Sequence, residues 1–476
     1  MPPFVPNGAP AMPSPLPEKV RTAILSSLGA GVVPSIGLQH IQVGRRAEVD
    51  AMLRDLRAVE SGGASVRFVV GRFGAGKSFF LNVVRAVALE RKFVVAAADI
   101  TTERRLSGSG GAARGLYAEL TRNFATRSRT DGGALASIIE RWVGEVAHDA
   151  SGAGSPMELK PKTPQIEAVI TTRLRPLQDL VSGYDFAAVL SAYLRGFLDH
   201  NPELQTAAVR WLRGEYTSKT EARADLGVRT IIDDDSVYDY LKLWARFLRL
   251  AGYAGLMVCL DELVVLSHRL NNRTARDRNY EAILRIVNDC LQGSVEGLGV
   301  VFAATDDCLT DRRRGLFSYE ALATRLADNR FAADGLADLS GPVIRLAPLR
   351  REDCYVLLLN LRRVFANGRD EQALLPDPAL ERYLASCEQR MGAASFQTPR
   401  DTVKDFVGLL NVLEQNPSAD WAALIAGIKT RATTEPVPTA EDADESATRP
   451  VVPPAAPRAI PPADARDDGD LASFRL

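Results

Sequence analysis

The eight residues Gly71–Ser78 constrain what this chain can fold into more than any other stretch. Their sequence, GRFGAGKS, has glycine at the first and sixth positions and then lysine and serine. Ser65–Val70 before them has the composition of a short buried strand, and Phe79–Val87 after them continues with the apolar spacing of a helix. A strand, a glycine-rich turn and a helix in this order place backbone amides around a helix N-terminus, where phosphate binds. The sequence therefore predicts a nucleoside triphosphate site.

The residue types of this loop match the chemistry of a nucleotide's phosphates. Glycine lets the backbone approach phosphate oxygens closely, a lysine amine reaches the β- and γ-phosphates, and a serine hydroxyl is a ligand for Mg²⁺. A chance glycine-rich turn is the alternative, and the flanking strand and helix argue against it. The residues expected to contact the nucleotide are Gly71, Gly74, Ala75, Gly76, Lys77, Ser78 and Phe79.

A second stretch supplies the acids that such a site needs. Leu256–Leu260 is a continuous apolar run, typical of a buried parallel strand, and Asp261 and Glu262 follow it. Open α/β sheets bind ligands at the carboxyl ends of their strands. We expect Asp261 to hold Mg²⁺ together with Ser78, and Glu262 to orient or deprotonate the attacking water. The alternative for both acids is an ordinary strand end at the surface.

Two more positions are candidates for contact with the γ-phosphate. Thr305 or Asp306 follows the apolar run Gly299–Ala304, which we expect to lie between the loop and the acidic strand. An ordinary strand cap explains this residue about as well. Arg325 ends an expected helix ahead of the fifth strand, where it suits a role on a neighbouring subunit's γ-phosphate. A salt-bridged surface arginine is an equally good explanation.

Arg400 stands at a helix start in the last third of the chain. Thr398 and Pro399 precede it, and a threonine cap followed by a first-turn proline is a typical way to begin a helix. That start can aim Arg400 at a nucleotide held between two domains. An exposed arginine without a ligand is the alternative.

Strand and helix patterns alternate along most of the chain. The strand runs are continuously apolar rather than alternating, which favours a parallel sheet covered on both faces. The predicted class is therefore α/β: a P-loop NTPase core with a five-stranded parallel sheet, a large helical insertion after its second strand and a C-terminal helical lid domain. The expected segments are a Pro-rich arm (1–17), the first part of the core (18–100), the insertion (101–254), the rest of the core (255–349), the lid (350–431) and an acidic Pro-rich tail (432–476).

Composition separates the folded part from the two ends. Seven of the 27 prolines lie in residues 1–17, and the tail from residue 432 has 9 acidic and 4 basic residues, so we expect both ends to be disordered or extended. The rest carries 54 basic and 50 acidic residues, a bias too weak to indicate nucleic acid. The five cysteines and four histidines show no zinc spacing. Without a signal peptide or a long apolar run, the chain is expected to be cytoplasmic, with no membrane contact.

The order of these motifs resembles that of the AAA+ ATPases. Val43–Glu48, VGRRAE, is similar to a box that precedes the P-loop in the origin-recognition and STAND-type branch of that class. The resemblance implies that Gly44 and Arg45 lie against the adenine of ATP. A charged helix start is the alternative for this box.

A narrower resemblance is to the BREX-system ATP-binding proteins of the BrxD type, over roughly residues 20–415. It implies a bacterial ATP-binding and ATP-hydrolysing protein of an anti-phage, BREX-like defence system, with ATP and Mg²⁺ as cofactors and other defence-system proteins as partners. The stretches that carry it are GVVP (31–34), GLQHI (37–41), the P-loop with its two phenylalanines (71–80), TDDCL (305–309), RRGL (313–316), SYEAL (318–322) and FQTPRD (396–401).

Two functions fit these residues. One is a nucleotide-driven machine or switch that acts on DNA; the other is a STAND-like scaffold whose nucleotide state controls partner binding without motor activity. The sequence leaves open whether DNA is bound and whether the chain forms a homo-oligomer. Basic residues in the insertion are candidates for DNA contact, with a solvated helix face as the stronger alternative. They are Arg104, Arg105, Arg114, Arg122, Arg127 and Arg129.

Overall fold

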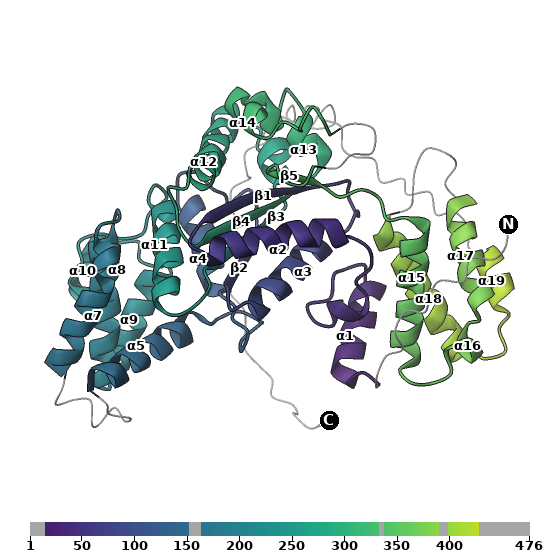
Figure 1. Cartoon of the computed structure of the whole chain (residues 1–476), viewed down its shortest axis with the longest axis horizontal. Coiled ribbons are helices and arrows are strands. Elements are labelled where there is room, and N and C mark those ends of the chain that lie inside the picture. Colours follow the sequence, from purple (N-terminus) through teal and green to yellow (C-terminus); the bar gives the residue numbers. More distant parts are fainter. Residues whose placement is uncertain (1–14, 152–162, 333–337, 390–397, 428–476) are drawn as a thin grey trace, which may run out of the picture. The chain divides into compact units, whose positions relative to one another are not determined.

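The computed structural model describes residues 15–151, 163–332, 338–389 and 398–427 of the chain (Figure 1). The predicted tail and most of the predicted N-terminal arm lie outside these residues. The predicted five-stranded parallel sheet is confirmed, with strand order β2-β3-β4-β1-β5. β4 lies between β1 and β3, as the sequence led us to expect. The strands are β1 (Ala64–Val70), β2 (Val94–Asp99), β3 (Leu256–Asp261), β4 (Leu298–Ala304) and β5 (Val343–Arg345).

Both faces of the sheet are covered, which explains why its strands are continuously apolar. On one face, α2 (Arg46–Glu60) and α3 (Lys77–Glu90) pack on strand residues such as Val69 and Met257 (Figure 1). On the other face, strand residues such as Phe302 belong to a larger apolar cluster that extends into the helical insertion. Folding of the insertion is therefore tied to folding of the sheet.

The segment between β2 and β3 is helical, as predicted. Its described parts contain no strand, and two isolated bridges are the only sheet-like pairing there. Trp244 lies at the centre of its core, edge-on to Phe124 and Phe186. The helices are α4 (Ala112–Arg122), α5 (Leu135–Ser151), α7 (Thr163–Gln178), α8 (Gly183–Leu198), α9 (Pro202–Leu212), α10 (Lys219–Leu226) and α11 (Val237–Leu250).

The connections on either side of β4 complete the core. α12 (Arg273–Leu291), which was not predicted, runs between β3 and β4 and packs against β1. The shorter elements are the π-helix η3 (Val265–Arg269) after β3, and α13 (Asp306–Thr310), the 3₁₀ turn η4 (Leu316–Ser318) and α14 (Glu320–Arg325) after β4.

The described elements after β5 are all helices, as predicted, and their role as a lid stays a prediction. Thr398 caps α18 with Pro399 in the first turn, and its hydroxyl accepts from the backbone N–H of Asp401, as the sequence predicted. The helices are α15 (Arg351–Ala366), α16 (Glu371–Leu374), α17 (Asp377–Gln389), α18 (Pro399–Gln415) and α19 (Trp421–Gly427).

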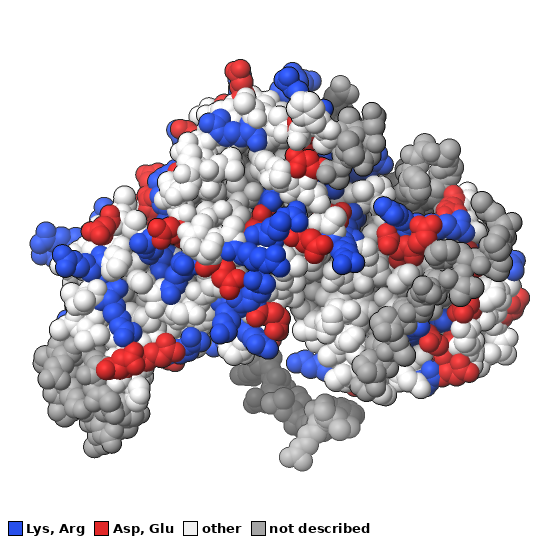
Figure 2. All heavy atoms as spheres, in the orientation of Figure 1, with Lys and Arg blue, Asp and Glu red and all other residues white. Residues whose placement is uncertain are grey.

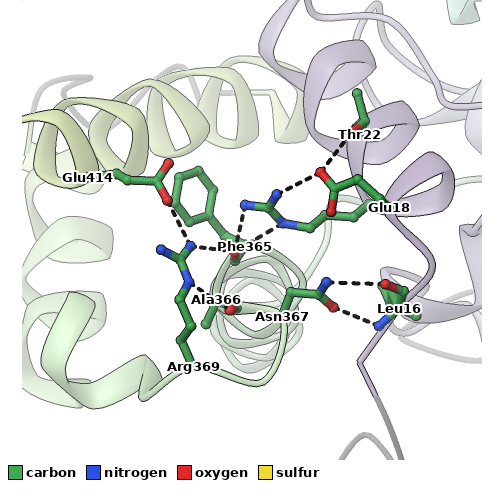
Figure 3. Close-up of polar contacts among 9 residues, drawn as sticks. Leu16, Glu18, Thr22, Phe365, Ala366, Asn367, Arg369 and Glu414 are labelled. Carbon is green, nitrogen blue, oxygen red and sulfur yellow. Dashed lines mark hydrogen bonds and ion pairs between the residues drawn. The ribbon is translucent and has the colours of Figure 1, made fainter.

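Helix α1 (Glu18–Gly29), from the other end of the chain, packs on α18 and α15. The side chain of Arg21 donates to the backbone oxygen of Phe365 at 3.0 and 3.2 Å. Asn367 faces Leu16, and its amide both accepts from the Leu16 N–H at 2.6 Å and donates to the Leu16 oxygen at 3.1 Å (Figure 3). The predicted arm of residues 1–17 therefore needs correcting at its end, since Leu16 is buried and hydrogen-bonded.

Two further observations bear on the class of protein. No helix in the described parts of the chain is long and apolar enough to cross a bilayer. All five cysteines lie in described segments, and all are free thiols.

Candidate nucleotide site

The loop Gly71–Ser78 joins β1 to α3 and has the backbone that its glycines allow. Gly74 and Gly76 have φ of 75° and 91°, in the left-handed region that favours glycine. The first turn of α3 begins at Lys77, so the free backbone amides of a helix N-terminus face the loop. The Lys77 amine donates to the carbonyl oxygens of Gly71 and Arg72, both at 3.0 Å.

The structure brings the predicted metal ligands together. The hydroxyl of Ser78 donates to the Asp261 carboxylate, with 2.6 Å between Oγ and Oδ2. The other carboxylate oxygen of Asp261 accepts from the backbone N–H of Glu262 at 2.8 Å. Residues 183 positions apart in the sequence thus meet where β3 ends beside the loop. Their oxygens are of the kind that Mg²⁺ prefers.

Glu262 is held in an unusual conformation next to these ligands. Its φ of 58° is in the left-handed region, where a residue with a Cβ is strained by about 1–3 kcal/mol. Burial raises the pKa of its carboxyl, and the neighbouring Asp261 and Asp99 raise it further. Burial also lowers the pKa of the Lys77 amine, against the opposing effect of Asp261 and Glu262. Strain and shifted pKa values at one place are typical of functional sites.

These residues fit ATP and Mg²⁺. No atom lies within 4 Å of the position that a Cβ on Gly76 would occupy, so the loop is open at that point. The described residues contain no cluster of three or more His, Cys, Asp or Glu side chains arranged for a metal. A magnesium site at the loop would be made of the Ser78 hydroxyl, the Asp261 carboxylate, phosphate oxygens and water.

Asp99 is a site residue that the sequence analysis missed. It ends β2 and lies in register with Asp261 on β3. Burial raises the pKa of its carboxyl, and Asp261 adds to the effect. The signal was an acid at the end of a buried strand, the same signal that identified Asp261. Only the P-loop made that signal persuasive for Asp261, because the pattern alone is common.

The start of α18 lies against the loop. A Cβ on Gly74 would come within 2.6 Å of the Thr398 side chain, so the two residues are in close contact. The guanidinium of Arg400 lies over the ring of Phe73, 5.2 Å from its centroid. That ring is 70% exposed. Arg400 also contributes to lowering the pKa of Lys77, which places its charge near the loop.

The box around Gly44 and Arg45 also reaches the loop. Arg45 donates to the backbone oxygen of Ala75 at 3.4 Å, and it pairs with Glu48 at the same distance. A Cβ on Gly44 would come within 3.2 Å of the Asp353 carboxylate on α15. The box therefore lies between the loop and the C-terminal helices, and its contact with adenine stays a prediction.

Three other candidates have local partners. Thr305 caps α13 by accepting from the N–H of Cys308, the contact of an ordinary strand-end cap. Asp306 pairs with Arg345 at 2.9 Å and also raises the pKa of Lys77. Arg325 donates to Asn288 and to the backbone of its own helix, and none of its described contacts is with the loop. The catalytic roles of Thr305 and Arg325 stay predictions.

The sheet, the loop and the acids at its edge define an α/β protein with a P-loop-like core. The model of the family "BREX system ATP-binding protein BrxC/D" matches residues 16–429, and the chain belongs to this family. No curated protein and no solved structure is found to match the chain. The family assignment confirms the narrower resemblance, to the BREX-system ATP-binding proteins, and supports nucleotide binding within a defence system.

Proposed function

We propose that this chain is an AAA+-type ATPase of a bacterial anti-phage, BREX-like defence system, and that bound nucleotide drives a change of shape. The observation that carries the proposal is the meeting of Ser78, Asp261 and Glu262 beside the loop. The family supports ATP binding. Hydrolysis, the AAA+ class and Mg²⁺ are our inferences from the residues.

Each residue has a defined task in this proposal. The loop amides and Lys77 bind the phosphates, and Ser78 and Asp261 hold the metal, which neutralises charge on the β- and γ-phosphates. Glu262 accepts a proton from the attacking water. Because the pKa of Glu262 is raised, its carboxylate is a better base than one at the ordinary pKa.

Arg400 and Thr398 link the nucleotide-binding loop to the C-terminal helices. Both belong to the start of α18, which contacts the loop at Gly74 and Phe73. A γ-phosphate in the loop attracts Arg400, and its loss on hydrolysis removes that attraction. We therefore infer that the angle of the C-terminal helices follows the nucleotide state, with Arg325 and Thr305 as further γ-phosphate contacts. Arg325 would act on a neighbouring copy of the chain.

The alternative is a STAND-like scaffold that uses the same contacts to control partner proteins without motor activity. The close packing of Thr398 on Gly74 supports a switch of this kind, because a change in the loop's backbone on ATP binding would be felt directly by the start of α18. ATPase rates with and without DNA separate the two functions. Molecular mass measured in ATP and in ADP separates a ring-forming oligomer from a monomeric switch.

Replacing Glu262 tests hydrolysis. We expect Glu262→Gln to keep ATP binding and lose about 10²- to 10⁴-fold in turnover, the usual contribution of a general base. Lys77→Ala should lose binding itself. Glu203→Gln, on the exposed first turn of α9, is the control and should retain both. Turnover and nucleotide affinity are measured separately, and unchanged turnover in Glu262→Gln would rule out its role as the base.

A further inference from the structure

A cavity whose lining includes three cationic side chains lies at the opposite end of β2 from the nucleotide site. Its volume is about 500 Å³, and its lining includes Lys92, Arg127 and Arg141 together with Ser128 and Tyr253. We call these five residues the basic pocket. Lys92 lies two residues before β2 begins, whereas Asp99 ends that strand beside Asp261. Six strand residues at roughly 3.3 Å each separate the two sites by about 20 Å.

Lys92 occupies a position at which glycine is the usual residue. The end of α3 is closed by two hydrogen bonds, from the Phe93 N–H to the Ala88 oxygen at 3.0 Å and from the Lys92 N–H to the Leu89 oxygen at 3.1 Å. This pattern places Lys92 in the left-handed region, with φ of 62°. A residue with a Cβ costs about 1–2 kcal/mol there. A strained lysine at this position suggests a use for its charge.

Arg127 and Ser128 are held at the pocket by a tight turn on the edge of the sheet. Ala125 exchanges two backbone hydrogen bonds with Val95 on the edge strand β2, at 2.8 and 3.0 Å. Thr126 and Arg129 then exchange two more, both at 3.0 Å, and close the turn. Arg127 and Ser128 are its central residues, so their side chains project from a fixed backbone.

The third cation, Arg141, comes from α5 and lies over the ring of Tyr253, 4.9 Å from its centroid. The arginine covers one face of this ring, and Phe93 is fully buried. Phe93 is therefore closed to stacking on bases, and one face of the Tyr253 ring is already covered. What the pocket offers is cationic and hydroxyl groups, the usual contacts to phosphate.

The acidic residues nearby do not neutralise the pocket firmly. Arg127 pairs with Glu90 at 3.2 Å and Arg141 with Glu145 at 2.9 Å. Both pairs are more than half exposed, and such pairs are worth only about 0–1 kcal/mol. Lys92 forms no ion pair within the described segments of the chain. A phosphate can therefore replace either glutamate at little cost.

We propose that the basic pocket binds the phosphodiester backbone of a nucleic acid, without reading its sequence. Figure 2 shows Lys and Arg side chains gathered between α5 and α3 on one face of the molecule, with some Asp and Glu side chains among them. The inference that a nucleic acid is what the ATPase acts on rests on the proposed function. Binding itself does not, because the pocket shares no residue with the nucleotide site.

Lys92→Gly gives the sharpest test. The variant removes one charge and puts glycine where the backbone favours it, so the protein should be at least as stable as the wild type. Binding of a fluorescent 30-base-pair DNA duplex is measured by anisotropy at several salt concentrations. We expect weaker binding and a salt slope reduced by about one. The double variant Arg127→Glu/Arg141→Glu should weaken binding at least about tenfold.

Arg351→Glu is the matched control. Arg351 forms an exposed ion pair with Glu388 on the C-terminal helices, much as Arg127 does with Glu90, and its variant should bind DNA within about twofold of wild type. RNA duplexes and single strands of the same sequence identify which nucleic acid is preferred. Undiminished binding in Lys92→Gly and the double variant, or an equal loss in Arg351→Glu, overturns the proposal. So does a wild-type protein that binds no nucleic acid. ATPase rates without DNA are measured in parallel. The ATPase rate of Glu262→Gln tests the proposed function and leaves the test of DNA binding unaffected.

Discussion

Glu262 and Lys92 both have a left-handed backbone conformation, with φ of 58° and 62°, but this conformation has a different structural role at each position. At Glu262 it turns the chain at the end of β3 so that the backbone N–H bonds to the Asp261 carboxylate. At Lys92 it ends α3 and begins the approach to β2. Neither position has the glycine that would relieve the strain, so each side chain is retained at a cost of about 1–2 kcal/mol.

Replacing Gly74 with alanine should have the opposite effect on stability from the same replacement at a helical glycine in α18. An alanine at Gly74 would strain a backbone with φ of 75° and collide with Thr398. We expect Gly74→Ala to lower the free energy of unfolding by at least about 1 kcal/mol and to weaken ATP binding. Gly408→Ala, where no atom lies within 4 Å of the new Cβ, should stabilise by about 0.5–1 kcal/mol.

Urea unfolding and a nucleotide titration measure both variants. Gly408→Ala is the matched control, since it adds the same methyl group without strain and without a close contact. Equal stability and equal ATP affinity in the two variants would contradict the close contact between the loop and Thr398.

The nucleotide-binding loop was predictable because the spacing of its glycines, lysine and serine specifies a local structure that binds phosphate. Asp261 and Glu262 were predictable only after the loop, since an apolar run ending in acids is common. Arg400 was suggested by its helix start and Gly44 by resemblance, and their contacts with the loop and with α15 depend on packing that no local pattern encodes.

Among the elements, buried strands were predicted well and α12 was missed. The strands are largely apolar runs, so their positions follow from composition, with ends shifted by at most two residues. The first half of α12 instead buries polar side chains. Arg276 donates to the Leu270 oxygen at 2.8 Å, and Asn279 exchanges two hydrogen bonds with the backbone of Ser107, both at 2.9 Å. Helical periodicity in apolar residues therefore begins only at Tyr280.

The C-terminal helices are joined by one buried cation. Arg362 on α15 is 1% exposed and donates to Asp377 at the start of α17 and to the oxygen of Leu375. Partial burial by itself would raise the pKa of Asp377, but hydrogen bonds from Arg362 and Gln372 outweigh it and hold the pKa below its ordinary value. The pair thus stabilises the charged form of the acid.

This pair predicts a pH dependence of stability. A lowered pKa contributes stability that is present above the unfolded pKa of about 3.9 and is lost as pH falls through the folded value. Asp377→Asn should therefore be less stable than wild type by about 1–3 kcal/mol at pH 7, with the difference shrinking below about pH 4. Urea midpoints between pH 7 and pH 3.5 measure it. Glu388→Gln, at an exposed pair, should change stability by less than about 0.5 kcal/mol, and a constant Asp377→Asn deficit would contradict the assignment.

For the chain as a whole, the family match ends at residue 429 and the tail beyond residue 432 carries a net charge of its own. That tail has 9 acidic and 4 basic residues, so its removal changes the net charge from −1 to +4. We expect a protein ending at residue 431 to keep its melting temperature and ATPase rate and to bind duplex DNA more tightly at low salt. Anisotropy at 50 mM and 300 mM salt measures it, and DNA binding that does not change at low salt would contradict this expectation.

The bonds of Arg21 and Leu16 to the end of α15 have a consequence for how the chain folds during synthesis. Helix α1 leaves the ribosome before its partners in α15 and α18, which are made more than 320 residues later. Until then its apolar side lacks its native cover, and pairing so distant in sequence is slow. Completion of α18 is therefore the event that lets helix α1 take its place.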